Sequence, residues 1–374
     1  MNICSKLILF LIITGLGTIN SSAITKEEPK EKNADGPYLF YLPDGNKRII
    51  SVDTNGCIKD TIFASTNFIL PVTSHSGKHK FEVQLHPITR QSCKSPKSKK
   101  LFVISDPHGN LDCFVSVLRS NNIIDESYNW IYGKNHLIIL GDVFDRGKDV
   151  LPIFWLIYKL EKEAQDAGGQ LSFLLGNHEP MVLAGDYRYM DKTYKELAEK
   201  LNIDYRDMFG PDTELGCWLA TRNAMQIIGN DLFVHAGLSK AFLEKNLSVE
   251  QVNEELSRGL FMSKQERKEL SPLTEFLYGS EGPIWYRGMV RNDEKYNPLH
   301  INDLQLILNR YKVKRIIVGH TIFPDIKTLY GRRVITVNVD NKKNFESVTG
   351  RGILIKNSKT FVISDKGILK ELYL

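Results

Sequence analysis

The chain has 374 residues, of which 42% are hydrophobic and 25% are charged, so it can bury a large core. Lysine and arginine total 49 against 44 for aspartate and glutamate, and a formal charge of +5 is too mild to indicate a nucleic-acid-binding surface. Ordinary glycine and proline usage excludes collagen-like and low-complexity chains. We therefore expect a folded protein with one large domain or two modest ones.

Residues 1–23 have the features of a secretory signal peptide. Lys6 precedes an apolar run from Leu7 to Leu16, and Ser21-Ser22-Ala23 offers small residues to a signal peptidase. The run is short against the roughly 20 residues of a membrane-spanning helix, which makes a retained anchor the weaker alternative. We expect cleavage before Ile24, export to a periplasmic or extracellular location, and no stable membrane insertion of the mature chain.

Four cysteines would remain after cleavage: Cys57, Cys93, Cys113 and Cys217. In an oxidising compartment Cys57 and Cys93 could pair, because both lie in the region least able to build its own core, and the sequence leaves this disulfide open. Apolar neighbours predict that Cys113 and Cys217 pack in the core.

Residues 24–100 form a predicted N-terminal extension. A charged leader covers residues 24–36, and short apolar or alternating runs then predict strands at 38–42, 48–52, 63–72 and 80–85, separated by Gly-containing turns. The basic, turn-prone stretch 94–100 is expected to be a linker in preference to a phosphate-binding patch.

Residues 101–374 form the predicted main domain, in which buried strands alternate with helices. Five short apolar runs, each ending directly in Gly, Asp, Asn or His, predict strands at 101–105, 136–140, 170–175, 232–235 and 315–318. A helix is expected over 150–167, stopped by Gly168 and Gly169. Because ligands bind at the carboxyl ends of strands in open α/β sheets, we expect these ends to converge on one site.

Two insertions between the strands should rim that site. Residues 180–214 and 238–284 contain amphipathic patterns that predict helices at 193–201 and 249–260. In the first insertion, candidate substrate contacts are Asp186, Tyr187, Arg188 and Tyr189, with a structural role equally open.

Five motifs that follow these strands carry metal-ligand residue types. They are Asp106-Pro107-His108-Gly109, the segment 141–147 (GDVFDRG), Gly176-Asn177-His178-Glu179, His235 within 233–237, and His320 within 318–321. One Asp-x-His occurs often by chance. Five such pieces, each after an apolar strand and flanked by glycines, are a strong joint signal.

The donor set predicts a pair of metal ions. Carboxylate, imidazole and amide donors without a thiolate suit divalent Mn, Fe or Zn. One ion is expected on Asp106, His108 and Asp142, and the other on Asp142, Asn177, His235 and His320. Such a pair generates hydroxide near neutral pH and stabilises both the attacking and the leaving oxygen of a displacement at phosphorus. The predicted chemistry is phosphoester hydrolysis.

In this order the motifs, spanning about residues 101–340, resemble the calcineurin-like metallophosphoesterase superfamily. Within it, residues 174–179, 213–216 and 285–288 resemble the Shewanella-like branch of the phosphoprotein phosphatases. The resemblance implies an α/β fold with two β-sheets sandwiched between helices and metals at the loops. Together with the strand pattern of residues 37–90, it predicts a small β-rich N-terminal appendage on that fold.

The resemblance also implies roles for residues beside the metals. His178, oriented by Asp145, matches the acid that protonates the leaving oxygen. Arg146 and Arg287 match the clamp on the phosphoryl oxygens, and Asn177 would contact phosphate as well as metal. The implied reaction is direct attack of metal-bound hydroxide on a phosphomonoester without a covalent enzyme intermediate, and the first substrate class is phosphorylated protein.

Departures from the resemblance leave the substrate open. Ser105 stands before Asp106 where many relatives have Gly, and Leu175 stands before Gly176 where typical eukaryotic Ser/Thr phosphatases have Arg. Neither residue separates phosphoserine from phosphotyrosine, and dinucleoside polyphosphates or small phosphomonoesters are alternative substrates.

Two other readings of the chain are weaker. Cys113 and Arg119 match the Cys-x5-Arg spacing of thiolate phosphatases, but the apolar residues between them predict a helix instead of a phosphate-binding loop. A non-catalytic metal-binding module would require the loss of ligands or of His178, and all of these residues are present.

Overall fold

The computed structural model describes residues 34–64 and 69–372. The predicted signal peptide lies outside the described residues, as does most of the charged leader. Across the described ranges, no helix combines the length and the apolar character needed to cross a bilayer.

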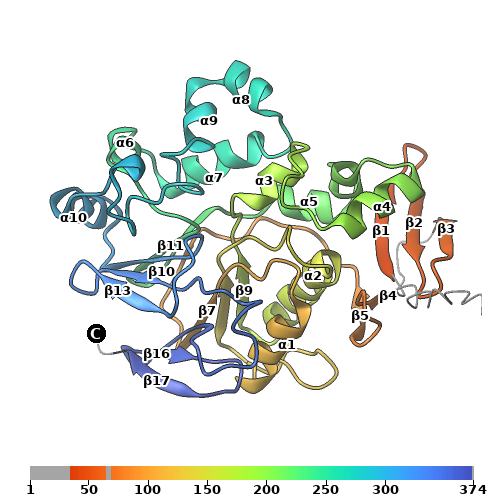
Figure 1. Ribbon diagram of the computed structural model, residues 1–374, viewed down its shortest axis with the longest axis horizontal. Helices are drawn as coiled ribbons and strands as arrows, with labels where there is room; N and C mark the ends of the chain where they lie inside the picture. The colour runs from red at the N-terminus through yellow and green to blue at the C-terminus, as the bar shows by residue number, and fades with distance from the viewer. Residues whose placement is uncertain (1–33, 65–68, 373–374) are drawn as a thin grey trace, which may run out of the picture. The chain divides into compact units, whose positions relative to one another are not determined.

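Two six-stranded sheets form the core of the fold (Figure 1). The first has the strand order β17-β16-β15-β7-β8-β9, with β7 (Lys100–Ile104), β8 (His136–Ile139), β9 (Gln170–Phe173), β15 (Gly352–Lys356), β16 (Lys359–Ile363) and β17 (Leu369–Leu372). The second has the order β13-β14-β12-β11-β10-β6, with β6 (Lys94–Ser95), β10 (Met225–Ile228), β11 (Asp231–Val234), β12 (Arg315–Val318), β13 (Lys327–Leu329) and β14 (Val334–Thr336). Strands β7, β8 and β9 are parallel, as are β11, β12 and β14, so their carboxyl ends meet at one edge of each sheet.

Side chains alternate between the two faces of each sheet, as the two-residue period of a strand requires. On β7, Leu101 and Val103 belong to the apolar cluster shared by the two sheets, whereas Phe102 and Ile104 belong to the larger cluster that includes the helices. Both faces are therefore buried, which explains why these strands read as continuous apolar runs.

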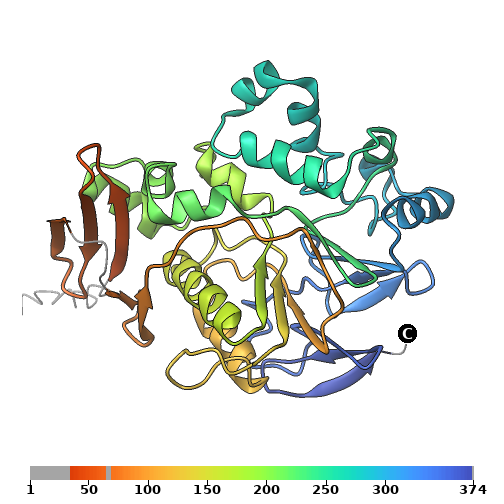
Figure 2. The ribbon, with the colours of Figure 1, turned by 180° about the vertical axis from the view of Figure 1, so that it is seen from behind.

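Helices cover the sheets (Figures 1 and 2). Helix α2 packs on β9 and α1, and α7 packs on β10. The predicted helices at 150–167, 193–201 and 249–260 correspond to α2, α4 and α7. The helices are α1 (Leu111–Ser120), α2 (Val150–Asp166), α3 (His178–Leu183), α4 (Lys192–Leu201), α5 (Glu214–Ala220), α6 (Lys240–Glu244), α7 (Val249–Arg258), α8 (Lys264–Leu270), α9 (Pro272–Leu277) and α10 (Ile301–Tyr311), with 3₁₀ turns η1 (Tyr205–Phe209) and η2 (Glu294–Tyr296).

The N-terminal region is rich in strands, as predicted. Strands β1 (Asp35–Tyr41), β2 (Lys47–Val52) and β3 (Ile58–Phe63) form an antiparallel sheet, and β4 (Ile69–Thr73) pairs with β5 (Lys80–Gln84). The prediction of one strand over 63–72 is wrong, because this range contains the last residue of β3 and most of β4, which are separate strands. Strand β3 was missed because five of its six side chains are exposed, which leaves no apolar alternation to detect.

This N-terminal region shares the core of the main domain. Trp155 Nε1 on α2 donates to Pro37 O at 2.9 Å, and the Tyr38 ring meets the Phe209 ring edge-on at 5.8 Å. The stretch predicted as a linker is also fixed in place, since β6 pairs in parallel with β10 and Lys100 opens β7. Figure 2 shows the chain after β5 running across the sheets toward β6.

The four cysteines in the described residues are free thiols. Cys57 is exposed, whereas Cys93 is buried with its Sγ atom 3.4 Å from Glu250 Oε1, so the disulfide left open by the sequence is not formed in this structure. Cys113 is buried on α1, as predicted. The core prediction for Cys217 is wrong in part, because this residue is only half-buried and its thiol donates to Pro211 O.

The predicted α/β fold of two sheets between helices, with a strand-rich N-terminal region, is confirmed. The division of the chain into segments at residues 23 and 100 stays a prediction.

Candidate active site

The motif loops at the carboxyl ends of the parallel strands are joined by backbone hydrogen bonds. His108 N donates to Asp142 O and Gly109 N to Val143 O, each at 3.0 Å. A Cβ atom on Gly109 would lie 2.6 Å from the backbone of Gly147, so only glycine permits this approach.

The backbone at these loops is strained. Six motif residues other than glycine have φ between 42° and 73°, a left-handed region that side chains disfavour, and they are Asp106, His108, Asp142, Asp145, Arg146 and His320. Each such residue costs about 1–3 kcal/mol, and such strain concentrates at functional sites. Left-handed backbone also occurs outside the motifs, but four of the six predicted metal ligands, Asp106, His108, Asp142 and His320, adopt it.

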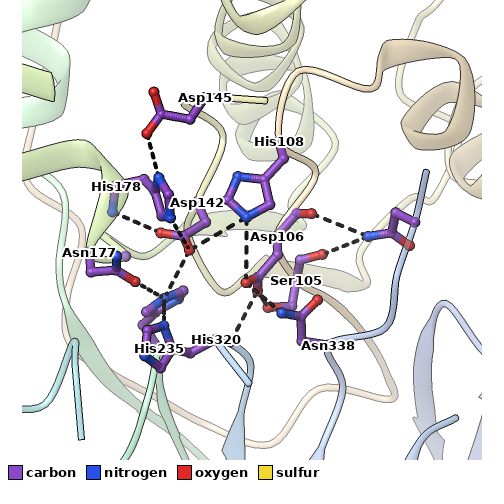
Figure 3. A network of polar contacts seen from close by, with 12 residues as sticks. Ser105, Asp106, His108, Asp142, Asp145, Asn177, His178, His235, His320 and Asn338 are labelled. Atoms are coloured by element: carbon purple, nitrogen blue, oxygen red, sulfur yellow. Dashed lines mark hydrogen bonds and ion pairs between the residues drawn. The ribbon is translucent and has the colours of Figure 1, made fainter. Parts of the chain in front are cut away.

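Asp142 lies at the centre of the assembled side chains (Figure 3). Its Oδ2 atom is 3.2 Å from His235 Nε2 and 3.8 Å from both His108 Nε2 and His178 Nε2. Asp106 adjoins this group, with Oδ2 4.0 Å from His108 Nε2. This position suits the bridging ligand predicted for Asp142, because one carboxylate oxygen faces imidazole nitrogens on both sides.

The second group surrounds His235 Nε2. This atom lies 3.0 Å from Asn177 Oδ1 and 3.2 Å from His320 Nδ1, in addition to its contact with Asp142. His235 Nδ1 is 2.5 Å from Leu140 O and so carries a proton that points away from the group. The lone pairs of a carboxylate, an amide and two imidazoles then face one another, and a cation satisfies them all. The residues present therefore fit a divalent metal ion.

Both groups place the metal-ligating atoms inward by anchoring the opposite ring nitrogen. His108 Nδ1 lies 2.8 Å from Phe144 O, which leaves Nε2 free to face Asp142, just as Leu140 O does for His235. Such backbone anchors are typical of metal-binding histidines. The structure thus brings together all six predicted ligands, Asp106, His108, Asp142, Asn177, His235 and His320.

The charged carboxylates set the protonation of the buried histidines. Burial alone would lower the pKa of His235, but the nearby carboxylates of Asp142 and Asp106 raise it to about 9. Burial lowers the pKa of His108 to about 3. The carboxylates therefore favour a positive charge at this position, which a bound metal ion would also supply.

His178 sits beside the metal ligands at the start of α3. Its Nδ1 atom is 2.5 Å from Asp145 Oδ2, and both side chains are buried. Burial would lower the pKa of His178, yet the carboxylates of Asp142 and Asp145 outweigh it and raise the pKa. A protonated imidazole with Nε2 facing the site is suited to donate a proton. His178 also lies close enough to His108 and Asp142 to be a metal ligand itself.

The two predicted phosphate-binding arginines lie near different motifs of the site. Arg287 Nη1 donates to Thr321 Oγ1 at 3.0 Å, next to His320. Arg146 is exposed, and its backbone N–H donates to Tyr189 O at 3.0 Å. The Tyr189 ring lies 5.4 Å from the His178 ring and 5.9 Å from the Arg146 guanidinium, so this residue of the first insertion borders the site.

Two asparagines that the motifs did not identify hold Asp106. Asn338 Nδ2 donates to Asp106 Oδ2 at 2.7 Å, and Asn341 Nδ2 lies 3.2 Å from Asp106 O and 3.3 Å from Ser105 O. Both asparagines follow β14, more than 230 residues along the chain from Asp106. No predicted motif contains them, although Asn338 follows the apolar run 334–337 of a parallel strand, which is the signal that could have identified it.

Glu179 is a further missed residue, although the third motif contains it. Its fully buried carboxylate accepts backbone N–H groups from Asp142 at 3.1 Å, Val143 at 2.8 Å and Gly176 at 2.7 Å. It therefore ties the second motif to the third. Burial raises the pKa of Glu179 to about 7.

A cavity of about 470 Å³ opens beside the site. Its lining includes Asp106, His108, Arg146, Asn338 and Asn341, so a substrate in it would reach both the first metal group and a candidate phosphate ligand.

The thiolate alternative does not fit the structure. Cys113 lies within α1, and burial raises its pKa to about 12, so the thiol stays protonated. Arg119 Nη2 donates to Glu126 O at 2.7 Å, and its guanidinium lies over the Tyr128 ring. These two residues form no phosphate-binding loop.

Comparisons with known proteins agree with this geometry. The calcineurin-like phosphoesterase family matches residues 99–324. The chain is 30% identical over 228 residues to Shewanella-like protein phosphatase 1 of Plasmodium berghei (strain Anka), covering 60% of this chain and 62% of the relative. It is 27% identical over 269 residues to Shewanella-like protein phosphatase 2 of Arabidopsis thaliana, covering 60% of this chain and 67% of the relative.

Among solved structures, a cold-active protein-tyrosine phosphatase of a psychrophilic Shewanella species superposes with a TM-score of 0.82. It is 30% identical, and the match covers 91% of this chain and 99% of that chain. The family match spans the segment that carries all five motifs, and the predicted resemblance is confirmed. The chain belongs to the calcineurin-like phosphoesterase family.

Proposed function

We propose that the protein is a dinuclear metal-dependent phosphatase that hydrolyses phosphomonoesters, with phosphorylated protein as its substrate. The observation that carries the proposal is the gathering of six metal-ligand side chains around Asp142, with His178 and Asp145 beside them. Relatives named as protein phosphatases support the same substrate class.

Divalent metal ions are implied by the family, and their identity as Mn, Fe or Zn is part of the proposal. Asp106, His108 and Asp142 would hold one ion, and Asp142, Asn177, His235 and His320 the other. When bound, the ions would supply Lewis acidity and lower the pKa of water.

The protein's own residues bind phosphate and move a proton. Arg287 and Arg146 would bind phosphoryl oxygens as the substrate enters from the cavity. His178 Nε2 would donate its proton to the leaving oxygen, while Asp145 holds Nδ1 and keeps the imidazole oriented. The attacking oxygen comes from water, so no covalent bond to the enzyme forms.

Phosphotyrosine is the phosphomonoester that we favour. The Shewanella structure is that of a protein-tyrosine phosphatase, and the half-exposed ring of Tyr189 beside His178 could stack on an aromatic leaving group. Hydrolysis of dinucleoside polyphosphates or small phosphomonoesters is the second candidate, since the 470 Å³ cavity could admit these ligands too.

The test is a parallel assay of the Mn²⁺-loaded protein on p-nitrophenyl phosphate, phosphotyrosyl and phosphoseryl peptides, and diadenosine tetraphosphate. We expect turnover of p-nitrophenyl phosphate, with the phosphotyrosyl peptide as the best substrate. Preferred cleavage of diadenosine tetraphosphate would instead select the second candidate. No turnover of any substrate by the metal-loaded protein would reject the proposed activity.

We also propose that the chain is exported, on the strength of the signal-like residues 1–23. N-terminal sequencing of the protein from its own cells should begin at Ile24. A mature protein that retains Met1 would contradict export by cleavage.

A further inference from the structure

A surface rich in lysine lies at the end of the sheets opposite the metal ligands. Its ten basic residues lie on or beside β6, β7, β12, β15 and β16, and we call this set the basic surface: Lys94, Lys97, Lys99, Lys100, Arg310, Lys312, Lys314, Arg315, Lys356 and Lys359. Lys100 opens β7 and Arg315 opens β12, whereas Asp106 and His320 follow the other ends of these strands. At about 3.3 Å per residue, the basic surface lies roughly 15–20 Å from the metal ligands.

The charges on this surface are poorly balanced. Three carboxylates pair with it, Asp231 with Arg315, Glu250 with Lys94 and Glu371 with Lys359. Ten basic side chains against three acidic ones give +7, whereas the whole chain carries +5, so the remaining residues sum to −2. The excess positive charge of this set is therefore larger than the charge of the whole chain.

Three of these lysines are direct neighbours across adjacent strands. Lys356 on β15 pairs with Lys100 on β7 and with Lys359 on β16. Directly opposed residues lie about 5 Å apart, and like charges in such positions destabilise a sheet. Within the described residues, neither Lys100 nor Lys356 has a carboxylate partner. An anionic partner would relieve the repulsion within such a row.

A cavity of about 250 Å³ opens within the basic surface, with room for a phosphate-sized group. Lys97 Nζ spans its edge and donates to Ser358 Oγ at 3.0 Å. The lining includes Lys97, Ser98, Asp231, Lys314, Arg315 and Ser358.

The available donors favour a diffuse anionic surface over a nucleic acid. Arg315 is fully engaged with Asp231 and Thr360, and Arg310 donates to the carbonyls of Asn246 and Leu247. The groups left free are lysine ammoniums, which act as point charges and do not read base edges. A second cavity in the basic surface, of about 580 Å³, lies beside Lys94, Arg310 and Lys312. Tyr311, the one aromatic residue in the linings of these two basic-surface cavities, is half-buried, so they provide no row of stacking rings.

We propose that the basic surface docks the protein on an anionic phospholipid bilayer, with the metal ligands facing away from the membrane. Lysines near an anionic bilayer each favour binding, and the sum over the unpaired lysines is enough for peripheral attachment. Attachment would need no apolar insertion and would weaken as salt screens the charges.

The test is flotation of the chain beginning at Ile24, which retains every described residue, with vesicles of phosphatidylcholine alone or mixed with phosphatidylglycerol. We expect binding only to the anionic vesicles, and loss of that binding when NaCl rises from about 0.05 to 0.5 M. The triple variant Lys100→Gln, Lys314→Gln and Lys356→Gln should bind about 100-fold more weakly.

A matched variant removes the same charge elsewhere: Lys195→Gln, Lys264→Gln and Lys268→Gln on the exposed faces of α4 and α8. It should keep wild-type binding and the wild-type melting temperature, and the basic-surface variant should melt no lower than the wild type, because it removes opposed like charges. Equal loss in the two variants would show that net charge alone drives binding and would overturn the proposal. So would equal binding to both vesicle types, tighter binding to duplex DNA than to vesicles, or binding of inorganic phosphate without binding of vesicles.

Discussion

Asn338 Nδ2 lies 2.7 Å from Asp106 Oδ2, so an amide that follows β14 of the second sheet holds a predicted metal-ligand carboxylate at the end of the first. Asp106 needs such support because its backbone is left-handed, with φ of 50°. The contact joins the two sheets at the candidate active site and orients the Asp106 carboxylate.

Asn338→Ala should weaken metal binding, because Asp106 loses the donor that orients it. We expect a loss of about 10–100-fold in Mn²⁺ affinity, measured by competition with a chelator. Asn302→Ala, on the exposed face of α10, is the control and should bind Mn²⁺ like the wild type. Unchanged affinity in Asn338→Ala would show that this contact does not support the metal site.

His178→Asn should distinguish a role of His178 as proton donor from a role as metal ligand. With His178 as the acid, kcat should fall by about 10²–10⁴-fold while the metal content stays that of the wild type. Asp145→Asn should produce a smaller fall, because Asp145 acts through the imidazole. A loss of bound metal in His178→Asn would instead assign His178 to the first metal group.

Arg287→Ala should weaken substrate binding. Arg287 is half-buried and is oriented by Thr321, so its removal takes away a positioned charge for phosphoryl oxygens. We expect KM for p-nitrophenyl phosphate to rise about tenfold or more, with weaker inhibition by inorganic phosphate. Arg291→Ala, one turn away, is the matched control. An equal rise in KM in both variants would show that Arg287 has no specific role in binding phosphate.

His136 should make the fold sensitive to acid. It is buried at the start of β8, Nε2 lies 2.9 Å from Ser172 Oγ, and burial lowers its pKa to about 3 from an ordinary value of 6.5. Between these values the unfolded chain binds a proton that the folded chain does not, so stability falls as pH drops from about 6.5 toward 3. The contribution is on the order of a few kcal/mol.

Urea unfolding of wild type and His136→Gln at several pH values measures this effect. The difference in free energy of unfolding between the two proteins should be constant above pH of about 7 and should change in favour of the variant below about 6. If the difference in free energy of unfolding stayed constant over the whole pH range, His136 would not be the source of the acid sensitivity.

The sequence was sufficient to predict which side chains come together at the candidate site where the signal is local in the chain. Each predicted metal ligand lies within a few residues of the end of a buried strand, and such strands have a strong apolar pattern. Parallel strands must place their carboxyl ends together, so motifs as distant as Asp106 and His320 could be assigned to one site.

Other parts depend on tertiary contacts that leave no local pattern. Asn338 and Asn341 reach Asp106 from a segment without a metal motif, and their hydrogen bonds exist only once the sheets pack. Strand β6 has two residues, too few for any periodicity, and pairs with β10 only in the folded sheet. Strand β3 escaped detection because five of its six side chains are exposed, so its sequence lacks the apolar alternation of a half-buried strand.

The most direct test of the shared metal centre is elemental analysis of Mn²⁺-loaded wild type and Asp142→Asn after removal of free metal. Because Asp142 faces both ligand groups, the account predicts close to two ions per chain in the wild type and a loss in the variant that exceeds one ion. Fewer than one ion in the wild type, or the same content in both proteins, would contradict a site built around Asp142.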